Sequence, residues 1–365
     1  MTAGVTASRF AAFDRLRGLI MIVMAIDHAS FFIARVHFYE AWSTFPVEPV
    51  TITRWITHLC APGFFLLMGA SMVWLGKARQ KAGWDHARIR WFFIKRGLVL
   101  LVVQQFIENI TWFVGTMTAA PNVTGSELPQ PGGGSDPFLV FLVISALAAS
   151  MIFWSWLIEL PSAVIAAVAG LAMAATWYFM PPHSEAATLF PYWRILLFTP
   201  SHHNFLQVVY AWVPWLAPSG LGIILGRIIY KKPGKIAVVA LAGGAALIAA
   251  HFVVGHSAYG AFYKYPPTPA FLTITLGIDL LLLAVLTVDR LPLVGQLEVF
   301  GRSPLFFYLL HLYVFAALSP LFRHGASYPV MYAVWAAGIL VMYPMVKKYG
   351  EFKASKPVES MWRLF

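Results

Sequence analysis

An apolar segment at residues 17–36 places the strongest constraint on how this chain can fold. As a helix with a rise of about 1.5 Å per residue, it would cross the roughly 30 Å hydrocarbon core of a bilayer. The segment nevertheless carries Asp27 and His28 near its middle. Ionisable side chains are expensive in hydrocarbon, so both should face protein or water inside a bundle. We therefore predict a transmembrane helix with a polar face directed into a helical bundle.

Composition extends this prediction to the whole chain. Hydrophobic residues make up 59% of the sequence and charged residues only 11%, whereas a soluble domain of this length would need far more charge to cover its surface. We predict an all-α, polytopic membrane protein with a single transmembrane domain over residues 1–365. The ten predicted spans are residues 17–36, 54–76, 97–117, 137–157, 160–180, 205–228, 236–255, 269–288, 303–322 and 328–346.

Lysine and arginine residues predict the orientation of these spans. Basic clusters precede the first span and follow the second, sixth, eighth and tenth, and the alternate loops hold few basic residues. With ten spans every basic cluster falls on the same side, so both termini should be cytoplasmic. The net charge of +11 is then an orientation signal, and no nucleic-acid partner is expected.

Three local motifs carry less weight. Pro214 and Pro218 predict a broken or kinked sixth span, which is tolerated where backbone is buried or lines a cavity. The adjacent pair His202-His203 lacks spaced partners, so no metal is expected. The triplet Asn122-Val-Thr124 fits a glycosylation acceptor, which matters only in a glycosylating host.

Four ionisable side chains on four spans are predicted to lie near the middle of the membrane. His28 and Glu108 should each lie about 16 Å from the cytoplasmic surface, and His311 about 13 Å from it. Asp279 lies ten residues into a span entered from outside, again near the midplane. Each of the four has a structural reading as a hydrogen bond between helices, and a functional reading as part of one buried site.

The first span also carries polar residues from the cytoplasmic surface to the middle of the membrane. Arg17 and His28 are eleven positions apart, about three helical turns, so they share one face, and Asp14 joins it one turn earlier. Asp14, Arg15 and Arg17 could serve only as interfacial anchors. Alternatively they bind a charged cofactor at the mouth of the bundle, with a base inside the membrane.

Several motifs occur in order along most of the chain: Phe13-Asp14-Arg-Leu-Arg17-Gly18, Met24-Ala-Ile-Asp27-His28, Arg54-Trp-Ile-Thr-His58-Leu-Cys-Ala-Pro62-Gly-Phe64, Met68-Gly69, Tyr210-Ala-Trp-Val-Pro214-Trp215, Lys264-Tyr-Pro-Pro267, Leu276-Gly277 and Gly301-Arg302-Ser-Pro304-Leu-Phe-Phe-Tyr308-Leu-Leu-His311. Together they resemble the bacterial membrane proteins related to heparan-alpha-glucosaminide N-acetyltransferase. The spacing from Arg17 to His28 also resembles a motif of the broader membrane acyltransferase family three.

The resemblance implies a transmembrane acyltransferase in the bacterial inner membrane, in contact with its lipids. Such proteins move an acyl group, usually acetyl from cytoplasmic acetyl-CoA, to a hydroxyl or amine of a sugar-like acceptor, often across the membrane. No metal cofactor is implied. The sequence leaves the acceptor, the acyl chain length, the choice between direct transfer and an acyl-enzyme, and the choice between a monomer and a homodimer open.

Residue roles follow under this reading. His28 or His311 takes the acceptor's proton, and one of three acids orients the imidazole; the acids are Asp27, Glu108 and Asp279. A group at the cytoplasmic mouth binds the CoA phosphates; it comprises Arg17 and Arg15, with Asp14, Arg96 and Arg302. Acceptors would enter from the outer side past a further group, which comprises Arg54, His58, Trp215, Lys264 and Tyr265.

Two other classes of function compete with acyl transfer. A transporter of a small anion or sugar would also use a broken span and midplane charges, although no inverted repeat is evident. A non-enzymatic scaffold would have no use for so many ionisable residues inside the membrane.

Overall fold

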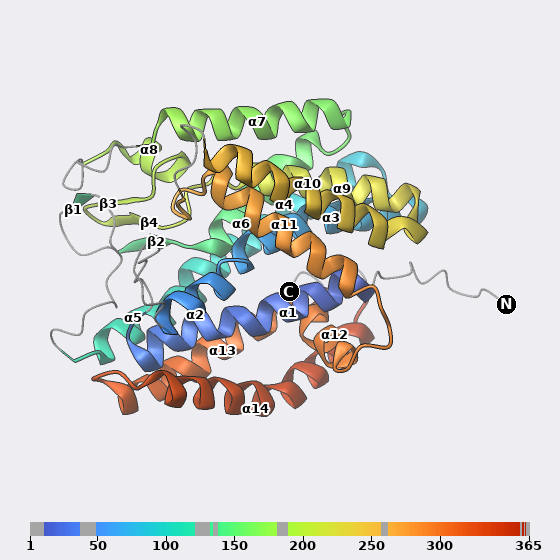
Figure 1. The fold of residues 1–365 in the computed structure, drawn as a ribbon. Helices are drawn as coiled ribbons and strands as arrows, with labels where there is room; N and C mark the ends of the chain where they lie inside the picture. Colours follow the sequence, from blue (N-terminus) through green and yellow to red (C-terminus); the bar gives the residue numbers. More distant parts are fainter. Residues whose placement is uncertain are drawn as a thin grey trace.

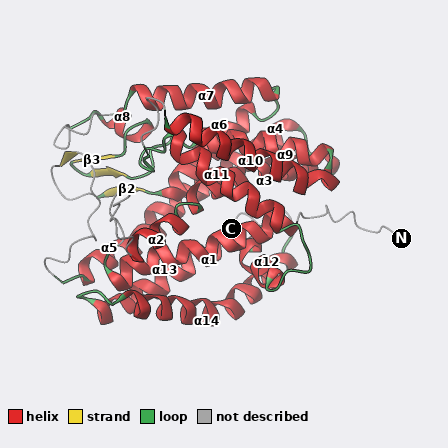
Figure 2. Ribbon diagram, in the orientation of Figure 1, coloured by secondary structure: helices red, strands yellow, loops and turns green. Residues whose placement is uncertain are grey.

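The computed structural model describes residues 11–36, 49–120, 132–133, 138–180, 189–256, 262–357, 360 and 362. This part of the chain is a bundle of helices with one small sheet (Figure 1, Figure 2). The helices are α1 (Ala11–Ala29), η1 (Ser30–Ala34), α2 (Pro49–Thr57), α3 (Cys60–Lys81), α4 (His86–Val103), η2 (Gln104–Glu108), α5 (Asn109–Thr118), α6 (Val143–Leu157), α7 (Ser162–Tyr178), α8 (Tyr192–Leu197), α9 (Leu216–Lys231), η3 (Pro233–Lys235), α10 (Ile236–Gly255), α11 (Pro269–Val285), α12 (Val294–Arg302), α13 (Pro304–Leu318), η4 (Ser319–Phe322) and α14 (Tyr328–Ser355). The predicted glycosylation triplet Asn122–Thr124 lies outside the described residues.

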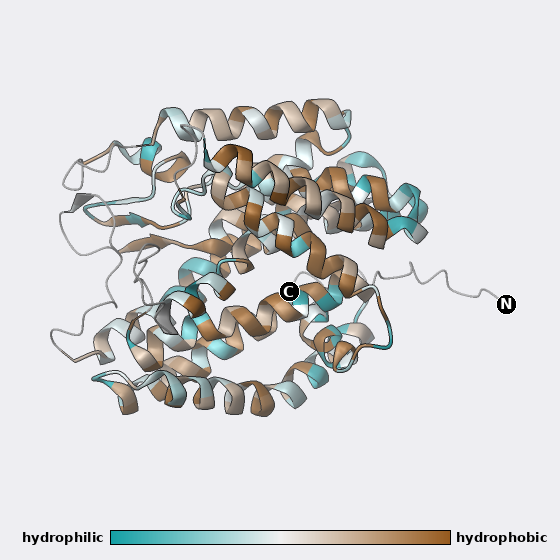
Figure 3. Ribbon diagram, viewed as in Figure 1, coloured by the Kyte–Doolittle hydropathy of each residue, from teal (hydrophilic) through white to brown (hydrophobic). Residues whose placement is uncertain are grey.

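The all-α membrane architecture is confirmed. Among the described residues, six helical segments are long and apolar enough to cross a membrane, and three shorter apolar helices accompany them. Apolar residues dominate the helices, whereas hydrophilic residues gather at helix ends and turns (Figure 3). Each of the ten predicted ranges overlaps a helix of the structure. The membrane side of the termini stays a prediction.

The predicted sixth span, 205–228, is wrong in its first half. Residues Leu206–Val208 form strand β4, turns follow, and α9 begins only at Leu216. Pro214 lies just before this helix, and Pro218 lies in its first turn, where a missing backbone N–H leaves no hydrogen bond unmade. The prolines therefore mark the start of a shorter helix.

The small sheet caps one end of the bundle. Its strands are β1 (Gly132–Gly133), β2 (Leu139–Phe141), β3 (Ser201–His203) and β4 (Leu206–Val208), in the order β1-β3-β4-β2. β3 and β4 are antiparallel, and β2 runs parallel to β4. A separate buried cluster under α8 includes Phe190, Ile195 and Val208. The sheet orders the segment that precedes α9.

Helix α1 forms the centre of the bundle. It packs against α3 and α11 on one side and against α13 and α14 on the other (Figure 1). Most of its residues are buried, including the ionisable Asp14, Arg15, Asp27 and His28. The position of α1 explains why its polar side chains can meet partners from several helices.

Two glycines bring α1 and α12 into backbone contact. A Cβ atom on Gly18 would collide with the carbonyl oxygen of Leu297, and one on Gly301 would collide with the carbonyl oxygen of Asp14. Because both obstacles are backbone atoms, neither can rotate away. Small residues at both positions therefore set the close crossing that holds the start of α1.

We expect Gly301→Ala to lower the free energy of unfolding by about 1–3 kcal/mol, as for other overpacked sites. Gly295→Ala on the same helix is the matched control, because nothing lies within 4 Å of its added Cβ. The control should be neutral or slightly stabilising, since alanine is the better helix former. Unfolding of the detergent-purified variants measures both, and equal stability of the two would contradict the packing account.

Candidate functional site

Two histidines from distant parts of the sequence meet inside the bundle. His28 at the end of α1 and His311 on α13 place Nδ1 and Nε2, respectively, 2.6 Å apart. The rings are nearly parallel, with an interplanar angle of 7°, and both residues are buried. The structure therefore brings the two predicted base candidates into one hydrogen-bonded pair.

The second nitrogen of His311 fixes the direction of this hydrogen bond. His311 Nδ1 lies 2.9 Å from the carbonyl oxygen of Phe307, which can only accept, so Nδ1 carries the proton. In a neutral His311, Nε2 is then an acceptor, and His28 must donate from Nδ1. The lone pair of a neutral His28 is consequently on Nε2. The contacts assign the proton-accepting atom of the pair to His28.

Glu108 holds two aromatic side chains around His28. Its Oε1 accepts hydrogen bonds from Tyr308 Oη at 2.6 Å and from Trp112 Nε1 at 3.3 Å. Both rings make edge contacts with the His28 imidazole, with centroids 5.3 Å away for Trp112 and 5.9 Å for Tyr308. Glu108 thus positions the walls of the histidine site.

Two π-helical turns border this site. One, η1, follows His28 almost directly, and the other, η2, ends at Glu108. Such turns interrupt α-helices and occur often at functional sites. They re-aim side chains in a way that apolar periodicity does not reveal.

Asp27 belongs to a neighbouring polar group. Its Oδ1 accepts hydrogen bonds from Arg54 Nη1 at 2.5 Å and from Thr57 Oγ1 at 3.0 Å. Arg54 is only 2% exposed, so this is a buried ion pair between α1 and α2. These two partners of Asp27 are on α2, and its predicted role of orienting an imidazole stays a prediction.

The predicted acceptor residues gather beside this ion pair. The Lys264 ammonium lies 5.1 Å from the centre of the Tyr265 ring, and the Tyr265 hydroxyl lies 3.4 Å from that of Tyr210. Tyr210 in turn packs on Trp215. Burial alone would lower the pKa of Lys264, but Tyr265 and Asp27 raise it on balance, so the ammonium stays charged at neutral pH. His58 is fully buried and packs edge-on against Phe271.

Arg17 ties three helices together near the start of α1. It donates from Nη1 to Asp14 Oδ1 at 2.8 Å and to the Gly301 carbonyl at 3.0 Å, and from Nη2 to Ser71 Oγ at 2.8 Å. These bonds join α1, α12 and α3. Arg17 thus helps to hold these helices together, and its predicted binding of the CoA phosphates stays a prediction.

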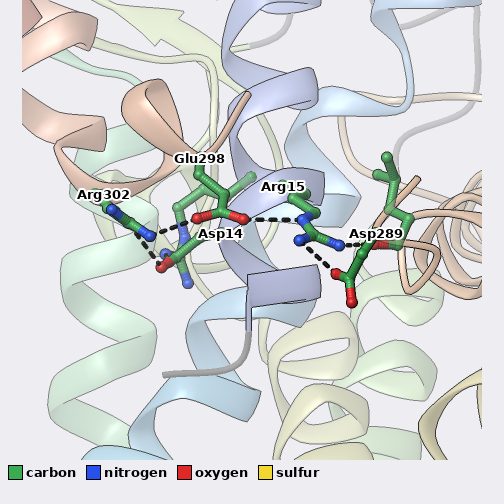
Figure 4. A network of polar contacts seen from close by, with 7 residues as sticks. Asp14, Arg15, Asp289, Glu298 and Arg302 are labelled. Carbon is green, nitrogen blue, oxygen red and sulfur yellow. Dashed lines mark hydrogen bonds and ion pairs between the residues drawn. The ribbon is translucent and has the colours of Figure 1, made fainter. Parts of the chain in front are cut away.

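Arg15 and Arg302 extend this group into a network (Figure 4). Arg15 pairs with Asp289 at 2.7 Å and Glu298 at 3.0 Å, and Arg302 pairs with Glu298 and lies 4.0 Å from Asp14. With Arg17 included, three arginines are matched by three carboxylates. Arg302 is the most accessible of the three, with 51% of its side chain exposed.

Two predicted residues lie apart from these groups. Asp279 is fully buried on α11 and faces Gly63 and Ile20. It therefore lies at a level between the arginines and the histidines. Arg96 lies on α4, which packs mainly against α6. Of the four ionisable residues predicted at mid-membrane depth, the structure joins His28, His311 and Glu108.

Sequence reasoning gave no role to Arg35, Trp112 or the hydroxyl of Tyr308. Arg35 is 1% exposed and donates to the carbonyl oxygens of Gly115 at 2.6 Å and Ser319 at 3.1 Å. It closes the end of the bundle beyond the histidines. A charged residue at the end of an apolar segment is equally typical of an interfacial anchor, so its burial was not predictable.

His202 and His203 have ordinary partners. Each ring lies 2.7 Å from a backbone carbonyl oxygen, that of Asn204 for His202 and that of Phe190 for His203. Across the residues that the structure describes, no three His, Cys, Asp or Glu side chains are grouped to hold a metal ion.

No curated protein matches the chain. The family model described as heparan-alpha-glucosaminide N-acetyltransferase, catalytic, matches residues 9–262, which include α1 with His28, the Asp27–Arg54 pair and Glu108. A match over more than half of the sequence indicates a membrane acetyltransferase, and the chain belongs to the heparan-alpha-glucosaminide N-acetyltransferase catalytic family.

Proposed function

We propose that this protein transfers an acetyl group from acetyl-CoA to a hydroxyl or amine of a sugar-like acceptor, with His28 as the general base. The observation that carries the proposal is the buried His28–His311 contact of 2.6 Å. A histidine pair with one defined proton acceptor suits a reaction in which a nucleophile must lose a proton. Membership of this acetyltransferase family supports acetyl as the group that is transferred.

Each residue of the histidine site has a defined part in the proposed reaction. The acceptor's oxygen or nitrogen attacks the thioester carbonyl carbon, and His28 Nε2 takes its proton. The resulting imidazolium is stabilised by its Nδ1–H bond to His311. The C–S bond then breaks, and the proton passes to the leaving thiolate, giving free CoA. Glu108 keeps Tyr308 and Trp112 against the imidazole throughout.

The two ends of the bundle suit the two substrates. We assign the CoA phosphates to the α1 start, where Arg302 is half exposed and Arg17 lies on the same network. We assign the acceptor to the side of Arg54 and Lys264, which hold buried positive charge close to Asp27. The donor end is then cytoplasmic, in a single transmembrane domain over residues 1–365 of an inner-membrane protein.

The test is acetylation by the purified protein in proteoliposomes. Acetyl-CoA is supplied with a panel of amino sugars and neutral sugars, and both free CoA thiol and acetylated product are measured. We expect the two to appear in equal amounts. Movement of a sugar or anion across the membrane without acetyl-CoA, and no acetylated product, would favour a transporter instead.

We expect Arg302→Ala to weaken acetyl-CoA binding by roughly 10–100-fold, because a hydrogen bond to a charged group contributes about 1.5–3 kcal/mol. Arg302→Lys should recover only part of the affinity, since it lacks the planar fork that pairs with phosphate. Lys232→Ala, at an exposed lysine after α9, is the control. Equal affinities of Arg302→Ala and wild type by titration calorimetry would remove Arg302 from the donor site.

A further inference from the structure

Asp279 is a buried acid that the proposed reaction does not use. It is 0% exposed, and within the described residues neither carboxyl oxygen has a hydrogen-bond partner. The nearest hydroxyl on its own helix, Thr275 one turn earlier, donates to the Phe271 carbonyl at 2.7 Å. The described chain therefore supplies no donor to this carboxyl group.

An unpartnered buried carboxyl group is unfavourable, as are other buried polar groups that lack hydrogen bonds. Packing does not explain its presence, because an apolar residue of similar size would fill the same space at lower cost. A hydrogen-bond partner from outside the described residues would offset this cost. A carboxyl group can accept N–H and O–H donors, and when protonated it also donates one hydrogen bond.

The Asp279 carboxyl points to where α1 and α3 approach each other. A Cβ atom on Gly63 would lie 3.0 Å from Asp279 Oδ2 and would also collide with Ile20. Only glycine therefore lets the carboxyl approach α3. This places the carboxyl group on the boundary between the three helices α1, α3 and α11.

Helix registers locate this point between the two ends of the proposed donor site. Gly63 is eight residues along α3 from Ser71, which binds the Arg17 guanidinium, so the two levels are about 12 Å apart. Ile20 is three residues along α1 from Arg17 and eight from His28, about 4.5 Å and 12 Å along the helix axis. Asp279 thus lies at a level between the arginine network and the histidine pair.

We propose that the Asp279 carboxyl group forms a hydrogen bond with an amide N–H or hydroxyl group of the pantetheine arm of acyl-CoA. This inference rests on the proposed function. A donor with its phosphates at the arginines and its thioester at His28 must pass the level of Asp279. The pantetheine arm is the part of CoA that crosses this distance, and its two amides and one hydroxyl are the donors that the carboxyl group lacks.

The experiment compares two ligands that differ only by this arm. Titration calorimetry measures binding of CoA and of phosphoadenosine diphosphate, the nucleotide part of CoA without pantetheine. We expect Asp279→Leu to lower the affinity for CoA by roughly tenfold and to leave the affinity for the nucleotide unchanged. Thr275→Val, fully buried on the same helix, is the control and should bind both ligands as wild type does.

A second variant tests the same contact if Asp279→Leu does not fold. Asp279→Ser keeps a small polar side chain that is too short to reach the same partner, and the same selective loss of CoA affinity is expected. Wild-type affinity for CoA in either folded variant, or an equal loss for both ligands, would overturn the assignment. If wild-type protein binds neither ligand, the proposed function itself fails, which is a different result.

Discussion

Replacing His28 with Gln is expected to lower the rate of acetyl transfer by roughly 10²–10⁴-fold, the usual contribution of a general base. Glutamine keeps much of the volume and can still donate to His311, but it cannot accept a proton at neutral pH. Binding of acetyl-CoA should change little, because the imidazole acts on the acceptor's proton. Single-turnover transfer and calorimetric binding measure the two effects separately.

His311→Gln is the matched control for this substitution. The side-chain oxygen of glutamine can accept the hydrogen bond from His28 Nδ1, so His28 keeps its lone pair on Nε2. We expect a smaller loss of rate than for His28→Gln. Near-wild-type transfer by a folded His28→Gln protein would show that His28 is not the base.

Replacing Arg54 with Met is expected to lower the free energy of unfolding by about 3–5 kcal/mol, the effect of breaking a buried ion pair. The Asp27 carboxyl group would lose the guanidinium, keep the hydrogen bond from the Thr57 hydroxyl and stay buried. Chemical unfolding in detergent, followed by tryptophan fluorescence, measures the loss.

A second substitution separates ion pairing from packing. Removing both charges in Asp27→Leu with Arg54→Met should restore much of the stability, because two apolar side chains can replace a buried pair at little or no cost. If the double variant is as unstable as the sum of the single variants, the loss comes from packing and the ion-pair account is wrong.

Hydropathy predicted the bundle because each long helix carries a sufficient apolar run. It failed at residues 205–215, where apolar residues belong to strand β4 and to turns of the small sheet. Short strands that pair with distant segments leave no periodic signal. The prolines indicated that this range was irregular, but not that its first half lacks a helix.

The sequence predicted how deep the site residues lie in the membrane, but not which way their side chains point. Counting residues placed His28, Glu108, His311 and Asp279 at one level, yet the rotation of each helix decides which side chains meet. The π turns at η1 and η2 alter that rotation locally, beside His28 and Glu108. Asp279, on an uninterrupted α11, instead faces Gly63.

The charged partners at the start of α1 were also only partly predictable from the sequence. The sequence indicated arginines near the membrane surface, and the resemblance gave them a phosphate-binding role. The carboxylate partners of Arg15 are Asp289 and Glu298, which lie more than 270 residues away, near and within α12, and sequence alone does not reveal such pairs. The network explains why α1, α3 and α12 keep one arrangement.

A double-mutant cycle on transfer rate tests the central claim that His28 and His311 act as one unit. The rates of His28→Gln, His311→Leu and the double variant are compared with wild type under saturating acetyl-CoA. Residues that work as a unit are strongly non-additive, so the double variant should be about as slow as His28→Gln alone. Losses that multiply would show that the two histidines act independently, and they would contradict the proposed mechanism.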